Sequence, residues 1–171
     1  MKPQPDAYAA FIDGMHEHQG ILGRICSVYA NSPEDRDDLR QEILLQAWRS
    51  FGSFRGEAAF STWLYRVALN TALMRGRKAA QGHEQPLEWQ DEELLAAPKA
   101  GEGDVDLERL EHCIRRLPSL ERAIVLLALE RRSYDEIAEI TGLSSGNIGV
   151  RLVRIKEKLR QRLIALGREE E

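Results

Sequence analysis

The 171-residue sequence has only two cysteines, few aromatic residues and no long apolar run. Cys26 and Cys113 lie far apart and lack the close spacing of metal ligands, so we expect two reduced, buried thiols and no bound metal. No apolar stretch approaches the ~20 residues that cross a bilayer. The N-terminus also lacks the apolar core of a signal peptide. We therefore expect a cytoplasmic protein that does not insert into a membrane.

Groups suited to catalysis are equally sparse. The four histidines are scattered along the sequence, at His16, His18, His83 and His112. No nucleophile, metal cluster or phosphate-binding loop accompanies them. An enzyme is therefore the least favoured class, and we expect neither catalytic residues nor a cofactor.

The net charge of −4 argues at first sight against nucleic-acid binding. The charge is segregated, however, because the segment Glu84–Glu111 is strongly acidic and Arg151–Arg168 is strongly basic. Local fields decide which surface binds a polyanion, so the total charge does not exclude a DNA-binding protein.

The hydrophobic pattern is helical and predicts an all-α fold of two domains, 1–80 and 106–171, joined by a flexible acidic linker at 81–105. In the first domain we expect three helices. The first runs from about Asp6 to Ala30. The second starts at Pro33 after a Ser32 cap and ends near Ser50. It should bury Leu39, Ile43 and Ala47.

The third helix belongs to the stretch Phe51–Lys78, which opens as a glycine-containing loop. Ser61 is the expected cap. The expected buried stripe comprises Trp63, Val67, Thr71 and Met74, and a second stripe carries Arg66, Asn70, Leu73 and Arg77. A cationic helix face with aromatic residues at its entry suits a nucleic-acid strand, since phosphates attract the cations and bases stack on the rings. On pattern alone, a packed helix with a solvated back is the more common explanation.

The second domain predicts four helices. The first should bury Leu107, Leu110, Ile114 and Leu117, and Ser119 should cap the second. Ser133 and Glu136 form a capping box for the third helix, and Gly142 ends it. Ser144 caps the last, whose inner face comprises Ile148, Leu152, Ile155 and Leu159. A short helix, a glycine turn and a longer basic helix make a helix-turn-helix, with the last helix presented to the major groove.

Three segments resemble bacterial extracytoplasmic-function sigma factors of the sigma-70 family. Phe54–Asn70 resembles their promoter-melting segment, Asp38–Glu42 their polymerase-docking signature, and Ser144–Arg154 their region-four recognition helix. The three occur in the family's order and spacing, so that the resemblance as a whole extends over nearly the whole chain.

The resemblance implies a transcription initiation factor that opens the −10 element with the first domain and reads the −35 element with the second. It implies as partners promoter DNA and core RNA polymerase, through the beta-prime clamp coiled coil and the beta flap. It also implies an anti-sigma factor and a role in stress response. The residues carried over for polymerase docking are Asp38, Leu39, Gln41 and Glu42. Those for the −10 element are Ser53, Phe54, Arg55, Phe60, Arg66, Asn70, Arg77 and Lys78. Those for the −35 element are Ser145, Asn147, Arg151, Arg154 and Lys158.

The segment Ser144–Arg154 departs from the family's pattern at two positions. Gly149 and Val150 stand where the family usually has a long basic residue and a small hydroxyl, so base readout falls to Asn147 and Arg151, with Arg154 as a third candidate. By the same resemblance, the acidic linker is expected to thread through the nucleic-acid channel of the polymerase.

The alternative function is a helix-turn-helix regulator that binds duplex DNA without polymerase. This alternative leaves the docking and melting segments unexplained.

Overall fold

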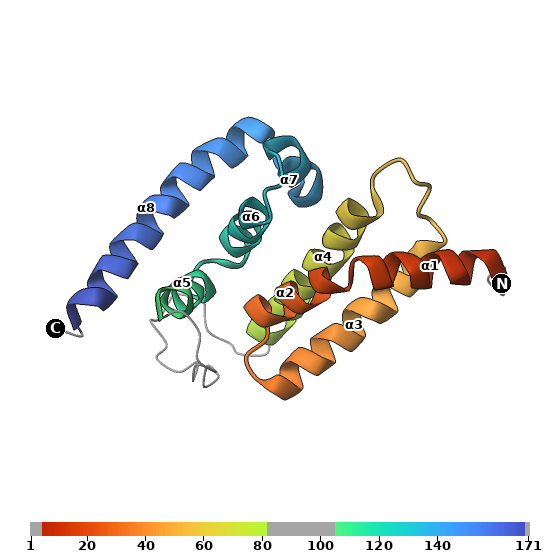
Figure 1. Cartoon of the computed structure of the whole chain (residues 1–171), viewed down its shortest axis with the longest axis horizontal. Coiled ribbons are helices and arrows are strands. Elements are labelled where there is room, and N and C mark those ends of the chain that lie inside the picture. The colour runs from red at the N-terminus through yellow and green to blue at the C-terminus, as the bar shows by residue number, and fades with distance from the viewer. Residues whose placement is uncertain (1–4, 82–104, 170–171) are drawn as a thin grey trace. The chain divides into compact units, whose positions relative to one another are not determined.

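The computed structural model describes residues 5–81 and 105–169, and every element within these ranges is a helix (Figure 1). The predicted all-α fold is therefore confirmed. The chain forms two compact units, α1–α4 and α5–α8, separated in sequence by residues 82–104. The expected linker at 81–105, including a helical turn near Trp89–Leu95, lies almost wholly outside the described residues.

The first unit begins with two helices, α1 (Pro5–Glu17) and α2 (Gln19–Tyr29), where we expected one. The backbone leaves the helical region at His18, with φ −111° and ψ 20°. Gly14 and Gly20 flank this break and weaken the intrinsic helical preference, each by up to ~1 kcal/mol. The first unit therefore has four helices among its described residues, and the prediction of three was wrong.

The third helix, α3 (Pro33–Phe51), has the predicted start and the predicted buried face. The Ser32 hydroxyl accepts a hydrogen bond from the Asp35 N–H at 3.0 Å, and Pro33 takes the first helical position. Glu34 and Asp35 lie in the first turn, at the positive end of the helix dipole. The side chains it buries include Leu39, Ile43 and Ala47, as predicted.

The fourth helix, α4 (Phe60–Gln81), buries a different face from the predicted stripe. Met74 is 57% exposed and Trp63 and Val67 are only half-buried, so of the predicted four only Thr71 is buried. The buried apolar residues are Leu64, Tyr65, Ala68, Leu69 and Ala72. Because α4 packs against both α2 and α3, its buried face is broad and rotated away from the predicted stripe (Figure 1). Ser61 lies inside this helix, so it is not the residue that precedes it.

The second unit comprises α5 (Val105–Arg115), α6 (Ser119–Leu129), α7 (Tyr134–Thr141) and α8 (Ser145–Glu169), as many helices as predicted. The long α8 packs against each of the other three (Figure 1). Three details differ from the prediction. Leu107, in the first turn of α5, is exposed, and Leu110 is only half-buried. Pro118, whose fixed φ suits a helix start, takes the N-cap position of α6 in place of Ser119.

Candidate nucleic-acid interface

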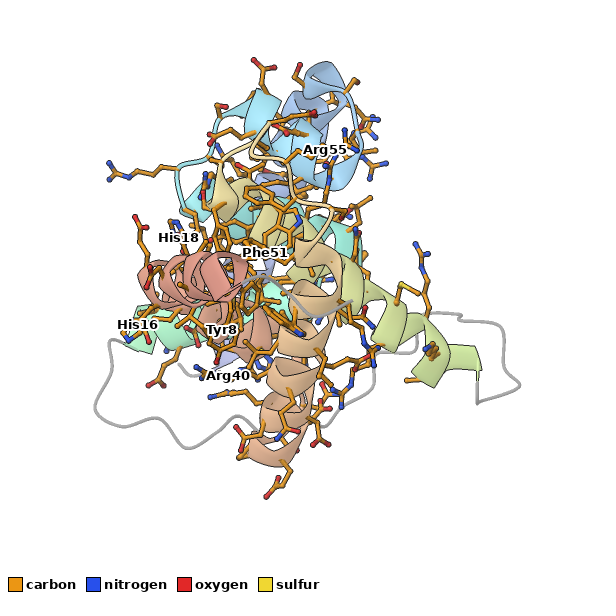
Figure 2. The ribbon with its side chains drawn as sticks, turned by 90° about the vertical axis from the view of Figure 1, so that its right-hand side faces the viewer. Tyr8, His16, His18, Arg40, Phe51 and Arg55 are labelled. Atoms are coloured by element: carbon orange, nitrogen blue, oxygen red, sulfur yellow. The ribbon has the colours of Figure 1, made fainter. Side chains whose placement is uncertain are left out.

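The loop between α3 and α4 rests on a cluster of four aromatic rings. Phe51 ends α3, Phe54 lies in the loop, and Phe60 and Trp63 begin α4. The ring centroids of Phe54 and Trp63 are 5.1 Å apart, as are those of Phe60 and Trp63. In the view of Figure 2, Arg55 lies in this loop above Phe51. Its exposed side chain and a half-buried ring, Phe54, are therefore presented together at the entry of α4.

Gly56 lies at the bend where the loop turns back toward α4. Its φ of +72° is in the left-handed region, which favours glycine because no Cβ is present to clash. The Ser53 hydroxyl donates a hydrogen bond to the Ser50 carbonyl at 2.7 Å, and the Phe54 N–H bonds to the Phe51 carbonyl at 3.0 Å. The part of the loop beside α3 is therefore held by local hydrogen bonds.

Gly14 of α1 and His18, at the break between α1 and α2, support this cluster, and the sequence did not single them out as functional. A Cβ placed on Gly14 would lie 2.7 Å from Cζ of Phe60, so the glycine allows the ring to approach the α1 backbone. The His18 ring stacks on the Phe60 ring, with their centroids 5.7 Å apart. Gly14 therefore serves close packing, in addition to weakening the helical preference near the break.

An exposed polar and cationic stripe runs along α4 from this cluster. Arg66, Asn70, Arg77 and Lys78 are exposed, and Leu73 is half-buried. Met74 also belongs to the exposed face, because it follows Asn70 by one helical turn. The expected nucleic-acid side of the helix is thus solvent-facing and carries one large apolar side chain that the pattern had assigned to the core.

Arg75 differs from the other cations of α4 because its guanidinium is used inside the unit. It forms an ion pair with Asp35 at the start of α3, and its Nη1 lies 3.8 Å from Oε2 of Glu42. Asp35 also accepts a hydrogen bond from the Asn31 N–H at 2.8 Å. Arg75 therefore ties α4 to α3, and the free cations of the stripe are Arg66, Arg77 and Lys78.

The predicted docking residues lie on α3, and one of them is not on the surface. Leu39 is 2% exposed, so its side chain belongs to the core of the unit. Asp38 and Gln41 are exposed, and Glu42 is partly exposed beside Arg75. Leu45, one turn beyond Gln41, is a large exposed apolar side chain that the sequence analysis did not assign.

The helix-turn-helix has the predicted local chemistry. The Ser133 hydroxyl accepts from the Glu136 N–H at 3.2 Å, and the Glu136 carboxylate accepts from the Ser133 N–H at 2.8 Å. Two hydrogen bonds lower the pKa of the Glu136 carboxyl. The larger effect comes from the Ser133 N–H, and the next from the Arg132 guanidinium, whose Nη1 donates to Oε1 at 2.9 Å. Gly142 ends α7 with φ +77°. The capping box and the glycine turn are both confirmed.

The last helix, α8, has the predicted cap and the predicted buried face. The Ser144 hydroxyl accepts from the Asn147 N–H at 3.3 Å, so the cap is confirmed. The four predicted inner residues, Ile148, Leu152, Ile155 and Leu159, are all buried. On the outer side Asn147 and Arg154 are exposed, and the Asn147 carbonyl oxygen accepts a hydrogen bond from Nε of Arg151 at 2.8 Å. Ser145, in the first turn, is half-buried.

Two further positions of α8 contact the rest of the unit. Nζ of Lys158 lies 2.8 Å from Oε1 of Glu121 in α6, so this predicted phosphate contact is engaged in an ion pair. A Cβ on Gly149 would lie 3.3 Å from the Tyr134 ring of α7. The unexpected glycine therefore lies where α7 crosses close to α8.

Both thiols are buried and unpaired, as predicted. Burial raises the pKa of Cys26 and of Cys113, which keeps each sulfur protonated. Within residues 5–81 and 105–169, no group of three His, Cys, Asp or Glu side chains is placed to hold a metal ion. None of the described helices combines the length and apolarity that a bilayer crossing needs.

Two family models match the chain, one in each unit. The model described as Sigma-70 region 2 matches residues 15–81, which include the aromatic cluster and the α4 stripe. The model described as Sigma-70, region 4 matches residues 107–159, which include the helix-turn-helix.

Curated relatives extend over most of the chain. It is 39% identical to the ECF RNA polymerase sigma-E factor of Haemophilus influenzae over 150 residues, which cover 77% of this chain and 76% of the relative. It is 31% identical to the RNA polymerase sigma-H factor of Pseudomonas aeruginosa, with 90% of this chain and 85% of the relative covered.

Solved structures share the fold. The sigma factor RpoE of Bartonella quintana, in complex with the anti-sigma factor NepR, aligns with a TM-score of 0.71 at 24% identity. That alignment covers 88% of this chain and 96% of the other. CnrH in complex with the cytosolic domain of CnrY aligns with a TM-score of 0.66 at 24% identity, over 92% and 90% of the two chains.

Proposed function

The chain belongs to the extracytoplasmic-function sigma factors of the sigma-70 family, and from that premise we propose how its two units share promoter recognition. As a sigma factor it directs promoter-specific transcription initiation by RNA polymerase. The first domain, 1–80, docks on the core enzyme and opens the −10 element. The second, 106–171, reads the −35 element, and 81–105 connects the two.

The observation that carries the proposal for the first domain is the continuity between the aromatic cluster and the exposed stripe of α4. The loop that contains Ser53, Phe54 and Arg55, with Phe60 below it, accepts a base flipped from the −10 non-template strand. Arg66 and Asn70 then hold the strand, and Arg77 and Lys78 attract its phosphates. Arg75 has no such role because Asp35 engages it.

Core docking is assigned to the exposed polar face of α3. Asp38 and Gln41 are fully available, and Glu42 is available in part. Carboxylates on one helical face complement a basic helix of a partner, here the beta-prime clamp coiled coil. Leu39 supports this face from the core and does not itself contact the partner.

Promoter contact by the second domain is assigned to α8. Asn147 and Arg151 face the base edges, since their side chains are the types that bond adenine and guanine in the major groove. Arg154 and Ser145 flank them. Lys158 attracts phosphate only after it exchanges Glu121 for the DNA, so we expect it to contribute less than the others. The remaining surface of this domain is available to the beta flap.

The factor acts in the cytoplasm, where the polymerase is, and it performs no catalysis of its own. One of the two structural neighbours is bound to an anti-sigma factor, and the other is bound to the cytosolic domain of CnrY. We extend this to the present chain and expect one anti-sigma partner that holds it inactive.

A binding experiment with and without core polymerase tests the proposal. Promoter duplex should be retained by the chain plus core but not by the chain alone, whereas a self-sufficient helix-turn-helix regulator would bind unaided. The docking assignment is tested by Asp38→Arg, which should weaken core binding at least tenfold, because charge reversal at a desolvated contact costs ~2–5 kcal/mol. Glu17→Arg, an equal charge change on exposed α1, is the control. If both variants bind core alike, α3 is not the docking face.

A further inference from the structure

The outer face of the recognition helix carries two adjacent valines that nothing in their own unit covers. Val150 is 54% exposed and Val153 is 70% exposed, and no large hydrophobic side chain in the described part of the chain is more exposed than Val153. The two are three residues apart, so they are neighbours on the helix surface. They lie opposite the buried face that includes Ile148 and Ile155.

Local structure does not account for these valines. A β-branched residue is a poorer helix former than the unbranched alternatives, so an exposed helical valine contributes little to folding. A single exposed apolar side chain is ordinary. Two adjacent ones, in the half of α8 that precedes Glu157, form a small apolar surface in the segment predicted to enter the groove.

The surroundings of the valines favour a nucleic acid over a protein as the occupant. Arg151 and Arg154 flank them, and Lys156 follows in the next turn. Protein interfaces are depleted of charge at their centre, whereas a DNA interface is strongly positive. The acidic residue of this face, Glu157, is one turn beyond Val153 and is paired with Arg160 at 3.1 Å.

Gly149 lies beside this surface. A Cβ placed there would lie 3.3 Å from the Tyr134 ring of α7, which is itself exposed. The ring therefore covers α8 at Gly149, and the exposed apolar side chains next to it are those of Val150 and Val153.

Within the major groove, the thymine C5-methyl is the one apolar group that a base edge presents. The two valines are separated by about 4.5 Å along the helix axis. Neighbouring bases of one strand are about 3.4 Å apart. Two adjacent thymines therefore match two adjacent valines, one methyl group for each side chain.

We propose that Val150 and Val153 read the C5-methyl groups of neighbouring thymines in the −35 element. This inference rests on the proposed function, in which α8 lies in the major groove. It makes Val150 a specificity residue in place of the hydroxyl that the resemblance led us to expect there. Asn147 and Arg151 then read the adjoining polar edges.

The test removes the methyl groups from the DNA and nothing else. Holoenzyme made from core polymerase and the full chain first selects duplexes from a pool randomised across the −35 element. Each selected thymine is then replaced by deoxyuridine, which has the same hydrogen-bonding groups, and affinity is measured by fluorescence anisotropy. We expect about fourfold weaker binding for each contacted methyl, the value for one buried carbon group.

Variants assign the effect to the side chains. Each of the variants Val150→Ala and Val153→Ala should bind the thymine and the deoxyuridine duplex with equal affinity where the replaced thymine is the one that its valine contacts. Neither should unfold, because alanine is the better helix former. Ile164→Ala, another exposed apolar residue of α8, should keep the full discrimination.

Two outcomes would contradict the inference, and only the second would also contradict the proposed role of the second domain. If holoenzyme selects a −35 sequence but binds thymine and deoxyuridine duplexes alike, methyl readout is wrong and the sigma function stands. If no −35 sequence is selected at all, the proposed role of the second domain fails, and this inference fails with it.

Discussion

Arg75 of α4 and Asp35 of α3 form an ion pair across the first unit, and neither side chain is more than one-third exposed. Asp35 also holds the N–H of Asn31, just before α3. One carboxylate thus joins the start of α3 to the second half of α4. The ion pair gives Arg75 a structural role, whereas its neighbours Arg66 and Arg77 are the arginines that we propose bind the DNA strand.

The first prediction compares Arg75 with Arg77. Arg75→Ala should lower the free energy of unfolding of the first unit by ~1–3 kcal/mol, because it leaves a partly buried carboxylate without its charged partner. Arg77→Ala should change stability by less than ~0.5 kcal/mol, since it is exposed and its assigned role is to attract phosphate. Urea unfolding monitored by tryptophan fluorescence measures both. Equal stability losses would mean that the ion pair does not matter.

The second prediction concerns the close approach of Gly14 to Phe60. Gly14→Ala should destabilise the first unit by ~1–3 kcal/mol, because the new Cβ would displace a ring held among Phe51, Phe54 and Trp63. Gly23→Ala is the matched control. Nothing lies within 4 Å of a Cβ there, so it should stabilise α2 by ~0.5–1 kcal/mol. Thermal unfolding checks both signs, and a stable Gly14→Ala protein would contradict the packing argument.

The third prediction tests the melting role of Asn70. Extruding a base costs a few kcal/mol, and a promoter already mismatched across the −10 region has no such cost. Asn70→Ala should therefore reduce run-off transcription more on duplex promoters than on pre-melted ones, at equal affinity for core. Lys78→Ala, a phosphate contact, should reduce both alike. Equal loss on the two templates for Asn70→Ala would leave it only a grip on the backbone.

The fourth prediction concerns the pH dependence of α7. The pKa of Glu136 is lowered in the folded chain by the Ser133 N–H and the Arg132 guanidinium. The stabilisation is therefore complete above the unfolded value of about 4.3 and is lost as the pH falls through the lower folded value. The protection factors of the α7 amides, which are corrected for the intrinsic exchange rate at each pH, should fall in that acidic window in the wild type. The Glu136→Gln variant, measured at the same pH values as the wild type, should show no such pH step. The same step in both proteins would assign it to another group.

The half-burial of Trp63 corrects an expectation of the sequence analysis. A fully buried tryptophan costs ~3–5 kcal/mol when truncated to alanine. Trp63 packs against half-buried rings, including Phe54, at the start of α4, whereas Tyr65 in the same helix is fully buried. We therefore expect the large loss of stability when Tyr65, and not Trp63, is truncated to alanine.

The sequence by itself determined the features that depend on a few consecutive residues. Ser32 with Pro33, the Ser133–Glu136 capping box and the left-handed Gly142 are all present as predicted. Each uses hydrogen bonds or backbone angles within about one turn, so the local residues suffice to specify them. The inner stripe of α8 was also predicted, because all four of its apolar residues at helical spacing are buried in the second unit.

Only the tertiary structure decided which polar side chains remain available and which face of α4 is buried. Arg75 and Lys158 read in sequence like their cationic neighbours, yet Asp35 and Glu121, 40 and 37 residues away, engage them. The rotated core face of α4 arises because α2 and α3 pack on it together. These outcomes depend on partners distant in the chain, and a periodicity within one helix contains no information about what packs against it.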